Sequence, residues 1–226
     1  MRVVLSGRDR ANLQATADLA DAEGIETLVA PVDVSDESSV TSLARSLEHE
    51  TISVLINNAG ILGPVAPLSE VTVEEWDEVF AVNVRGIFLM CKAFIPPMVQ
   101  RGSGDVINLA SVSGKRPLAR RSPYCASKMA VIGLTVTLAA EVGPSGVSVN
   151  SLSPGPVAGE RMWRIFALEA KRTGTSVEEA ERVFRSRTLL DRLIEEREVG
   201  YAVVAMLNMP GLAGADIDLS AGMVAR

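Results

Sequence analysis

The amino-acid sequence predicts an α/β fold, a doubly wound parallel sheet with helices on both faces. Short runs rich in β-branched residues alternate with longer stretches of helical periodicity along the 226 residues. This alternation is typical of successive strand–helix units, which build a parallel sheet and cover both of its faces. The length and the hydrophobic fraction of 47% suit a single domain over residues 1–226 with a substantial core.

In the first half of the chain the alternation predicts strands at 3–6, 26–32 and 52–57, and helices at about 10–22, 35–50 and 79–100. Asp9 can cap the first helix and Gly24 can end it. Thr72-Val-Glu-Glu75 has the capping-box pattern, so a further helix is expected to start at Val73, ahead of the long one.

The second half continues with strands at 105–109, 147–152 and 216–219, and helices at about 123–142 and 195–209. Residues 159–190 depart from this pattern and predict a helical insertion, a candidate lid over a substrate, in which Ser176-Val-Glu-Glu179 is a second capping box. Four large apolar residues there suit either packing against the domain or lining a substrate pocket: Met162, Trp163, Ile165 and Phe166.

Charge and hydropathy exclude several classes of partner. The net charge of −6 and the pI near 5.0 argue against nucleic-acid binding, because no basic stripe is present to neutralise phosphates. Arg116, Arg120 and Arg121 form the one local basic cluster, for which we favour a solvated loop over a contact with an anionic substrate. No stretch approaches the roughly 18 apolar residues of a membrane span, so the sequence predicts a cytoplasmic protein without a membrane partner.

No metal site is expected. The single histidine, His49, lies in an acidic helical stretch, where a surface position is the default. Cys91 and Cys125 lack the spacing of metal ligands and are interpreted as packed thiols in a reducing compartment.

Tyr124 and Lys128 stand four residues apart in a predicted helix, which places both side chains on one face. A phenol is a poor acid or base at neutrality, but a neighbouring ammonium favours the phenolate and suits the pair to proton transfer. Thirteen residues before Tyr124, Ser111 ends a short apolar run that is expected to be a buried strand carrying a hydroxyl at its carboxyl end.

A set of ordered motifs resembles the short-chain dehydrogenases/reductases: Asn57-Asn-Ala-Gly60, Asn83, Ser111, Tyr124-x-x-x-Lys128 and Pro154-Gly155. The resemblance runs from Val3 to about Val224. It implies a Rossmann-like fold and an NAD(P)-dependent oxidoreductase that interconverts a carbonyl and a secondary alcohol, a 3-oxoacyl-reductase-like activity being one option. An extended epimerase relative is disfavoured by the short length.

The resemblance implies four catalytic residues. Tyr124 transfers a proton to or from the reacting oxygen, Lys128 assists it, and Ser111 hydrogen-bonds the same oxygen. Asn83 matches a helix asparagine whose backbone carbonyl holds a water that connects Lys128 to solvent. The residue by itself would favour a locally bonded amide inside a helix.

The resemblance also implies cofactor contacts from Arg8, Asp33, Val34, Asn57, Ala59, Gly60, Tyr124, Lys128, Pro154 and Gly155. Asp33 and Val34 match a pair that contacts the adenine ring, although an Asp after a strand is also an ordinary helix-entry residue. Pro154-Gly155 matches the turn on the nicotinamide side. Arg8 stands where NAD-specific relatives present an acidic residue, and it suits a 2′-phosphate, so NADP is preferred over NAD.

The amino-terminal part of the family pattern is absent from this sequence. Arg2-Val-Val-Leu-Ser-Gly-Arg-Asp9 resembles the family's second strand, and no glycine-rich phosphate-binding turn occurs, so the fold is expected to be N-terminally truncated. Either the recorded start is internal to a longer enzyme, or the chain is short and has lost ordinary cofactor binding. We expect weakened cofactor binding and an empty or rearranged place beside strands 3–6 and 52–57. The rival interpretation is a catalytically impaired scaffold or binding protein.

Assembly into a homodimer or homotetramer is expected. The helices at 79–100 and 123–142 carry apolar residues on more than one face, including Ile87, Phe88, Val131, Leu134 and Leu138. The resemblance implies that these two helices form the subunit contacts. The substrate is expected to be a small molecule, held by residues 110–123 and 154–190, and its identity stays open.

Overall fold

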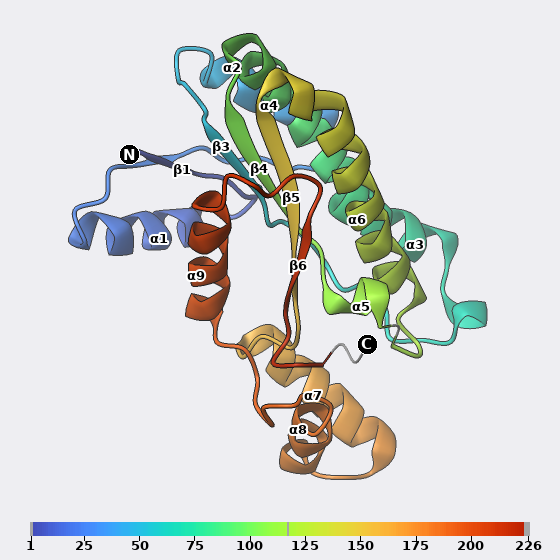
Figure 1. Ribbon diagram of the computed structural model, residues 1–226. Helices are drawn as coiled ribbons and strands as arrows, with labels where there is room; N and C mark the ends of the chain where they lie inside the picture. Colours follow the sequence, from blue (N-terminus) through green and yellow to red (C-terminus); the bar gives the residue numbers. More distant parts are fainter. Residues whose placement is uncertain (1, 117, 224–226) are drawn as a thin grey trace.

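The computed structural model describes residues 2–116 and 118–223 and confirms the α/β class (Figure 1). Val224, at the end of the stretch covered by the family resemblance, lies outside the described residues. The strands are β1 (Val3–Leu5), β2 (Thr27–Val29), β3 (Val54–Asn57), β4 (Gly104–Leu109), β5 (Val147–Pro154) and β6 (Asp216–Leu219). The helices are α1 (Arg10–Ala22), α2 (Glu37–Ser46), α3 (Val73–Phe80), α4 (Gly86–Arg101), α5 (Val112–Lys115), α6 (Ser122–Val142), α7 (Glu160–Thr173), α8 (Val177–Arg185) and α9 (Glu196–Leu207).

The helix boundaries follow from the expected caps. The Asp9 carboxylate accepts hydrogen bonds from the backbone N–H groups of Ala11 and Asn12, which fixes the start of α1. Thr72 and Glu75 form the expected capping box at α3. Ser176 accepts from the N–H of Glu179 at the start of α8. Polar side chains therefore satisfy backbone donors at the helix starts that the sequence marked.

All strand pairs are parallel, but the ladders form two separate groups among the described residues. One group pairs β1 with β2, and the other has the order β3-β4-β5-β6. No ladder joins β1 to β3. This agrees with the expectation of an empty or rearranged place beside these two strands. The direct pairing of the two strands, which the sequence left open, is not seen. Ile56 on β3 is 44% exposed, so this side of the strand is incompletely covered.

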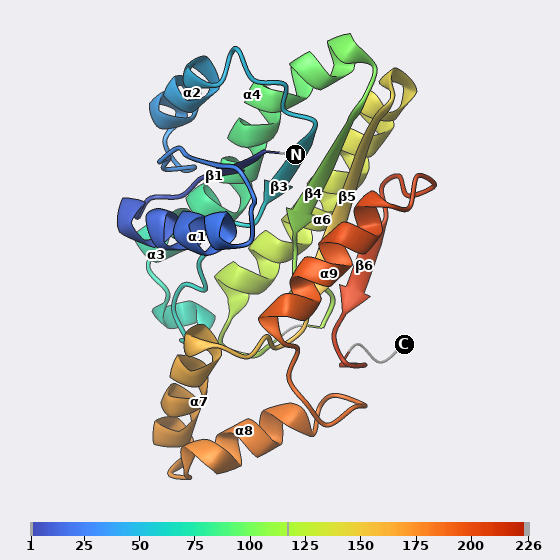
Figure 2. The ribbon, with the colours of Figure 1, turned by 90° about the vertical axis from the view of Figure 1, so that its left-hand side faces the viewer.

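Helices α4 and α6 cover one face of the four-stranded sheet (Figures 1 and 2). Buried residues of α4, such as Phe94 and Met98, pack in one cluster with Val106 of β4 and Val149 of β5. Before α4, the chain continues from α3 through a π-helical segment, Ala81–Arg85. Gly86 follows this segment, and a Cβ built there would lie 2.8 Å from Val34 Cγ2, so only glycine admits this contact.

Helix α9 packs on the opposite face, where Met206 shares a cluster with Ile107, Leu109 and Leu152 (Figure 2). Alternate residues of β4 therefore point to the two sides, Val106 toward α4 and Ile107 toward α9. Both faces of the sheet are covered, as a doubly wound fold requires. The sheet thus holds the carboxyl ends of β4 and β5 side by side at one edge.

Helices α7 and α8 project beyond this edge of the sheet (Figure 1). They have a small core of their own, in which Phe166 is fully buried against Phe184 at a ring-centroid distance of 5.3 Å. Met162 is buried in the same core, whereas Trp163 is 44% exposed and meets Phe166 by an edge contact. Phe166 therefore packs in this small core. Met162 and Ile165 pack in it too, and both also line a pocket at the edge of the sheet.

Two helical stretches are long and apolar enough to pass a membrane-span test, Val73–Arg101 and Ser122–Ser145. The expectation that no stretch approaches this length and hydropathy is therefore wrong. Within the most apolar 18 residues of each, 56% and 28% respectively are buried inside the protein, and core helices of soluble proteins pass the same test. The length and hydropathy of these two stretches are therefore weak evidence that the protein spans a membrane.

The outer faces of α4 and α6 differ in part from the expected pattern. Ile87 and Val131 are buried in the core and are not available to a partner subunit. Phe88 is 47% exposed, and Met129 and Val136 on α6 are also exposed. Leu134 and Leu138 are partly buried against the core. The expected subunit contact therefore rests on Phe88 and on exposed residues of α6 that were not singled out.

Candidate functional site

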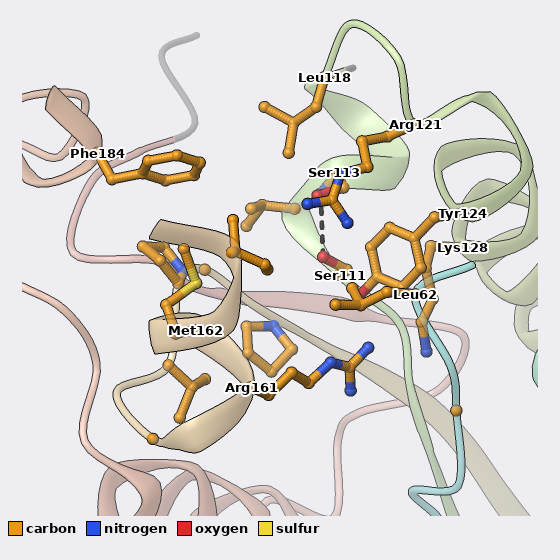
Figure 3. A pocket seen from close by; sticks show the side chains of 18 of the residues that line it. Leu62, Ser111, Ser113, Leu118, Arg121, Tyr124, Lys128, Arg161, Met162 and Phe184 are labelled. Atoms are coloured by element: carbon orange, nitrogen blue, oxygen red, sulfur yellow. Dashed lines mark hydrogen bonds between the residues drawn. The ribbon is translucent and has the colours of Figure 1, made fainter. Parts of the chain in front are cut away.

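A cavity of about 880 Å³ lies at the carboxyl ends of β4 and β5 (Figure 3). It is bounded by the end of β4, the start of α6, the turn after β5 and the inner sides of α7 and α8. Ligand sites of open parallel sheets lie at this edge, because the strand ends and the following loops converge there. The stretches 110–123 and 154–190, which the sequence predicted as the pocket, supply most of its lining.

Ser111, Tyr124 and Lys128 all line this cavity. Ser111 follows β4 and caps α5, its Oγ accepting the backbone N–H of Ser113 at 3.1 Å. Tyr124 and Lys128 lie one turn apart near the start of α6, and Lys128 Nζ is 5.9 Å from the centroid of the Tyr124 ring. In Figure 3 the ring extends toward Ser111. The three groups predicted to act together are therefore gathered in one place.

Lys128 is buried, with 4% of its surface exposed, and its Nζ donates to the Leu109 carbonyl at 2.6 Å. Burial, reinforced by the charge of Arg161, lowers the pKa of Lys128 to about 8. Gly60 is close to this ammonium, because a Cβ built there would lie 3.5 Å from Nζ and 3.2 Å from Asn83 Oδ1. A small residue at this position lets the loop after β3 reach the lysine.

Asn83 lies fully buried in the π-helical segment, and its side chain does not bond locally. Its Nδ2 donates to the Ile61 carbonyl at 2.9 Å and to Ser127 Oγ at 3.0 Å, and its Oδ1 accepts the Ile61 N–H at 2.8 Å. The alternative of a locally bonded helix amide is therefore wrong. The side chain instead ties the loop after β3 to α6, beside Lys128, and π-helical turns are often found at functional sites.

The loop after β3 contributes through its backbone and small residues. The Asn57 side chain points into the core, where its Nδ2 donates to Asn108 Oδ1 at 2.8 Å. Asn108 in turn donates to Thr135 Oγ1 at 2.9 Å, a buried polar chain that the sequence did not indicate. Gly60 lines the cavity, and Ala59 is exposed. The amide of Asn57 is thus occupied within the protein, and a cofactor contact from this loop rests on Ala59 and Gly60.

Arg8, Asp33 and Val34 lie at the ends of β1 and β2, away from the residues that line the cavity. The Asp33 carboxylate accepts from the Ser35 N–H at 2.9 Å and from its hydroxyl at 2.6 Å. These bonds, with a smaller effect of the Arg8 charge, hold the pKa of Asp33 below its usual value. Arg8 and Asp33 are therefore neighbours, and the Arg8 side chain is exposed, as a residue reaching for a phosphate would be.

Pro154 ends β5, Gly155 follows it, and both line the cavity. A Cβ built on Gly155 would lie 2.9 Å from Ser220 Cα, so the turn is packed closely against the segment after β6. The residues expected to contact a dinucleotide therefore lie in two places, Tyr124, Pro154 and Gly155 at the cavity and Asp33 after β2. Among the described residues no glycine-rich turn joins these places.

The arginines of the cavity wall, Arg121 and Arg161 among them, were not predicted as site residues. Arg121 is only 7% exposed and Arg116 is partly buried, so of the three only Arg120 is exposed as the solvated-loop interpretation requires, and it also borders the cavity. Arg161, at the start of α7, brings its Cζ to 5.9 Å from the Tyr124 ring centroid. The position of Arg121, immediately before the Tyr124 helix, is the sequence signal that could have placed it at the cavity.

The described residues hold no group of three or more metal-ligating side chains. His49 is exposed, as expected. Cys91 is buried next to Asn57, and burial raises the pKa of its thiol to about 12. The Cys91 thiol therefore stays protonated and unreactive, and it packs in the core.

The chain is similar to known proteins in sequence and in fold. The family model for short chain dehydrogenases matches residues 1–169. Gluconate 5-dehydrogenase of Gluconobacter oxydans is 36% identical over 169 residues, which cover 74% of this chain and 66% of that protein. The chain thus spans just under two thirds of the length of this curated relative.

Two solved structures share the fold over almost the whole chain. NAD⁺-bound xylitol dehydrogenase superposes with a TM-score of 0.93 at 26% identity, covering 98% of this chain and 88% of that one. A variant of actinorhodin polyketide ketoreductase with NADPH superposes with a TM-score of 0.93 at 27% identity, covering 98% and 87%. With Ser111, Tyr124 and Lys128 in one cavity and the family model matched by residues 1–169, this chain belongs to the short-chain dehydrogenase family.

Proposed function

We propose that this protein is an NAD(P)-dependent oxidoreductase that interconverts a carbonyl and a secondary alcohol on a small molecule. The observation that carries the proposal is the presence of Ser111, Tyr124 and Lys128 in one cavity at the sheet edge. The names of the relatives support it, since they are dehydrogenases and reductases. A 3-oxoacyl-reductase-like activity is one version of it.

The roles follow from the geometry and the chemistry of the side chains. Ser111 Oγ and the Tyr124 hydroxyl would hold the reacting oxygen, and Tyr124 would give it a proton during reduction and remove one during oxidation. The buried ammonium of Lys128 favours the phenolate. Asn83 fixes the loop that borders this ammonium. A bound nicotinamide cofactor supplies hydride transfer, which none of these side chains can perform.

Cofactor contacts are proposed at three places. Tyr124, Lys128, Pro154 and Gly155 would border the nicotinamide side, Ala59 and Gly60 the adenosine side, and Asp33 and Val34 the adenine. Arg8 favours NADP over NAD. We further propose a cytoplasmic homodimer or homotetramer, which sedimentation at micromolar concentration tests, a stable monomer being the contrary result.

Tyr124→Phe tests the chemistry. It removes the proton donor and keeps the ring, so turnover of a carbonyl substrate should fall about 10²- to 10⁴-fold while the melting temperature stays unchanged. Tyr201→Phe is the matched control, because Tyr201 on α9 is 69% exposed and lies outside the cavity. Near-full turnover by Tyr124→Phe would contradict the assignment.

The rival proposal is a scaffold or binding protein that has kept the fold without the activity. The separation of the β1–β2 ladder from β3 favours it, because that region would have to hold the pyrophosphate. Calorimetry with NADPH and NADH separates the two. A dissociation constant in the micromolar range supports the enzyme, whereas no heat of binding together with no turnover supports the rival.

A further inference from the structure

Arg121 is a buried residue whose guanidinium has no partner among the described residues. The residue is 7% exposed, yet its side chain takes part in no hydrogen bond or ion pair within ranges 2–116 and 118–223. Its nitrogens are not sealed in the protein, since they line the cavity beside Tyr124 (Figure 3). A buried charge is costly unless it is paired, so an unpaired guanidinium that faces a cavity indicates a missing anion.

Arg161 approaches the same space from α7. Its Cζ lies 5.9 Å from the Tyr124 ring centroid, and its guanidinium also lacks an ion-pair partner among the described residues. In Figure 3 the two guanidinium groups come from opposite walls toward Tyr124 and Ser111. Burial lowers the pKa values of Lys128 and Arg121, and the positive charge of Arg161 lowers both further.

The acidic groups nearby do not neutralise these two arginines. Glu169 is the carboxylate whose charge acts on Arg121, but it is already engaged by Arg172, whose Nε donates to it at 3.0 Å. The cavity wall carries six cationic side chains (Arg120, Arg121, Lys128, Arg161, Arg172 and Arg187) and three acidic ones (Glu160, Glu169 and Glu196). A cavity with a cationic excess in a chain of net charge −6 favours an anionic ligand.

We propose that the substrate carries an oxyanion, a carboxylate or a phosphate, which Arg121 binds with the help of Arg161 while the carbonyl or alcohol carbon lies at Tyr124. The planar guanidinium suits both groups, since it offers parallel N–H donors to two oxygens of either. This inference rests on the proposed function for the reacting carbon, but the anion site itself does not require turnover.

Binding of matched probes tests the anion site without catalysis. We would titrate the protein with 3-hydroxybutyrate against 2-butanol, and with glycerol 3-phosphate against glycerol, by calorimetry. The charged member of at least one pair should bind at least about tenfold tighter, and the preferred pair tells carboxylate from phosphate. Arg121→Gln should weaken that binding on the order of 10- to 100-fold. Arg182→Gln removes the same charge from α8, where Arg182 pairs with Glu179 and neither residue lines the cavity, and should leave binding unchanged.

The outcomes separate this inference from the proposed function. Equal affinity for charged and neutral probes, or no effect of Arg121→Gln on the charged ones, would overturn the anion site even if neutral alcohols are oxidised. Loss of NADPH affinity in Arg121→Gln with unchanged probe binding would also overturn it, because the guanidinium would then serve the cofactor. Selective anion binding lost in Arg121→Gln supports the site, even when no compound is turned over.

Discussion

Gly114 lies where α5 crosses α6, and the two helices carry the catalytic groups. Ser111 caps α5, and Tyr124 and Lys128 stand on α6. A Cβ built on Gly114 would lie 2.9 Å from Met129 N, 3.0 Å from Lys128 C and 3.2 Å from Lys128 O. These are backbone atoms and cannot rotate away. Gly114→Ala must therefore push α5 off α6 by a few tenths of an ångström.

The expected cost is that of overpacking, about 1–3 kcal/mol of the free energy of unfolding. For a chain of this length each kcal/mol shifts the melting temperature by about 2–4 °C, so a fall of about 2–12 °C is expected. The displacement separates Ser111 from Tyr124, so turnover should fall by more than the loss of folded protein explains.

Gly200→Ala is the matched control for Gly114→Ala. Gly200 lies inside α9, and a Cβ built there meets nothing within 4 Å. Alanine is favoured over glycine in a helix, so this variant should gain about 0.5–1 kcal/mol and melt about 1–4 °C higher. Thermal unfolding followed by circular dichroism measures both variants. A Gly114→Ala protein that melts at or above the wild-type temperature would refute the reasoning from close approach.

Two further predictions concern buried polar groups. Asn83→Ala removes the three hydrogen bonds that this fully buried residue makes to Ile61 and Ser127 and should cost about 2–5 kcal/mol, whereas Asn208→Ala, which loses one exposed bond to Val204, should cost less than about 1 kcal/mol. A urea titration of both compares them, and equal losses would contradict the role of Asn83. The pKa of Lys128 is about 8 in the folded chain and about 10.4 in the unfolded chain. Between these two pH values the unfolded chain therefore binds more protons than the folded one. The contribution of Lys128 therefore makes stability rise with pH in this window, by on the order of 1–2 kcal/mol from pH 8 to 9.5. The stability of Lys128→Met should lack this rise. If the variant keeps the same pH dependence as the wild type, burial does not lower the pKa of Lys128.

The sequence predicted the fold and the gathering of Ser111, Tyr124 and Lys128 at one place, because both depend on local patterns. Helix α1 and strand β6 begin and end at the predicted residues, since Asp9 caps the one and apolar residues alternate with aspartates in the other. Tyr124 and Lys128 share a face because four residues make about one helical turn. Ser111 joins them because its strand ends at the same edge of the sheet.

Other features depend on contacts between distant segments, which a single sequence does not encode visibly. Arg121 was expected in a solvated loop, but it is buried in the wall of the cavity that Arg161 of α7, far along the chain, also lines. The Asn57–Asn108–Thr135 chain joins two strands and a helix, and each residue alone looks like an ordinary polar position. The hydrogen bonds from the Asn83 side chain to Ile61 and Ser127 could likewise not be predicted before the fold was known.

The separation of β1–β2 from β3 also concerns how the protein opens. Residues 3–29, which form β1, α1 and β2, are hydrogen-bonded to each other but share no ladder with the four-stranded sheet. Val4 and Leu28 nevertheless pack against the main core. Opening of this segment would break those apolar contacts and leave every bond of the β3–β6 ladder intact. Amide hydrogens of β1 and β2 should therefore exchange with solvent through a partial unfolding that costs less free energy than the one that exposes β4 and β5.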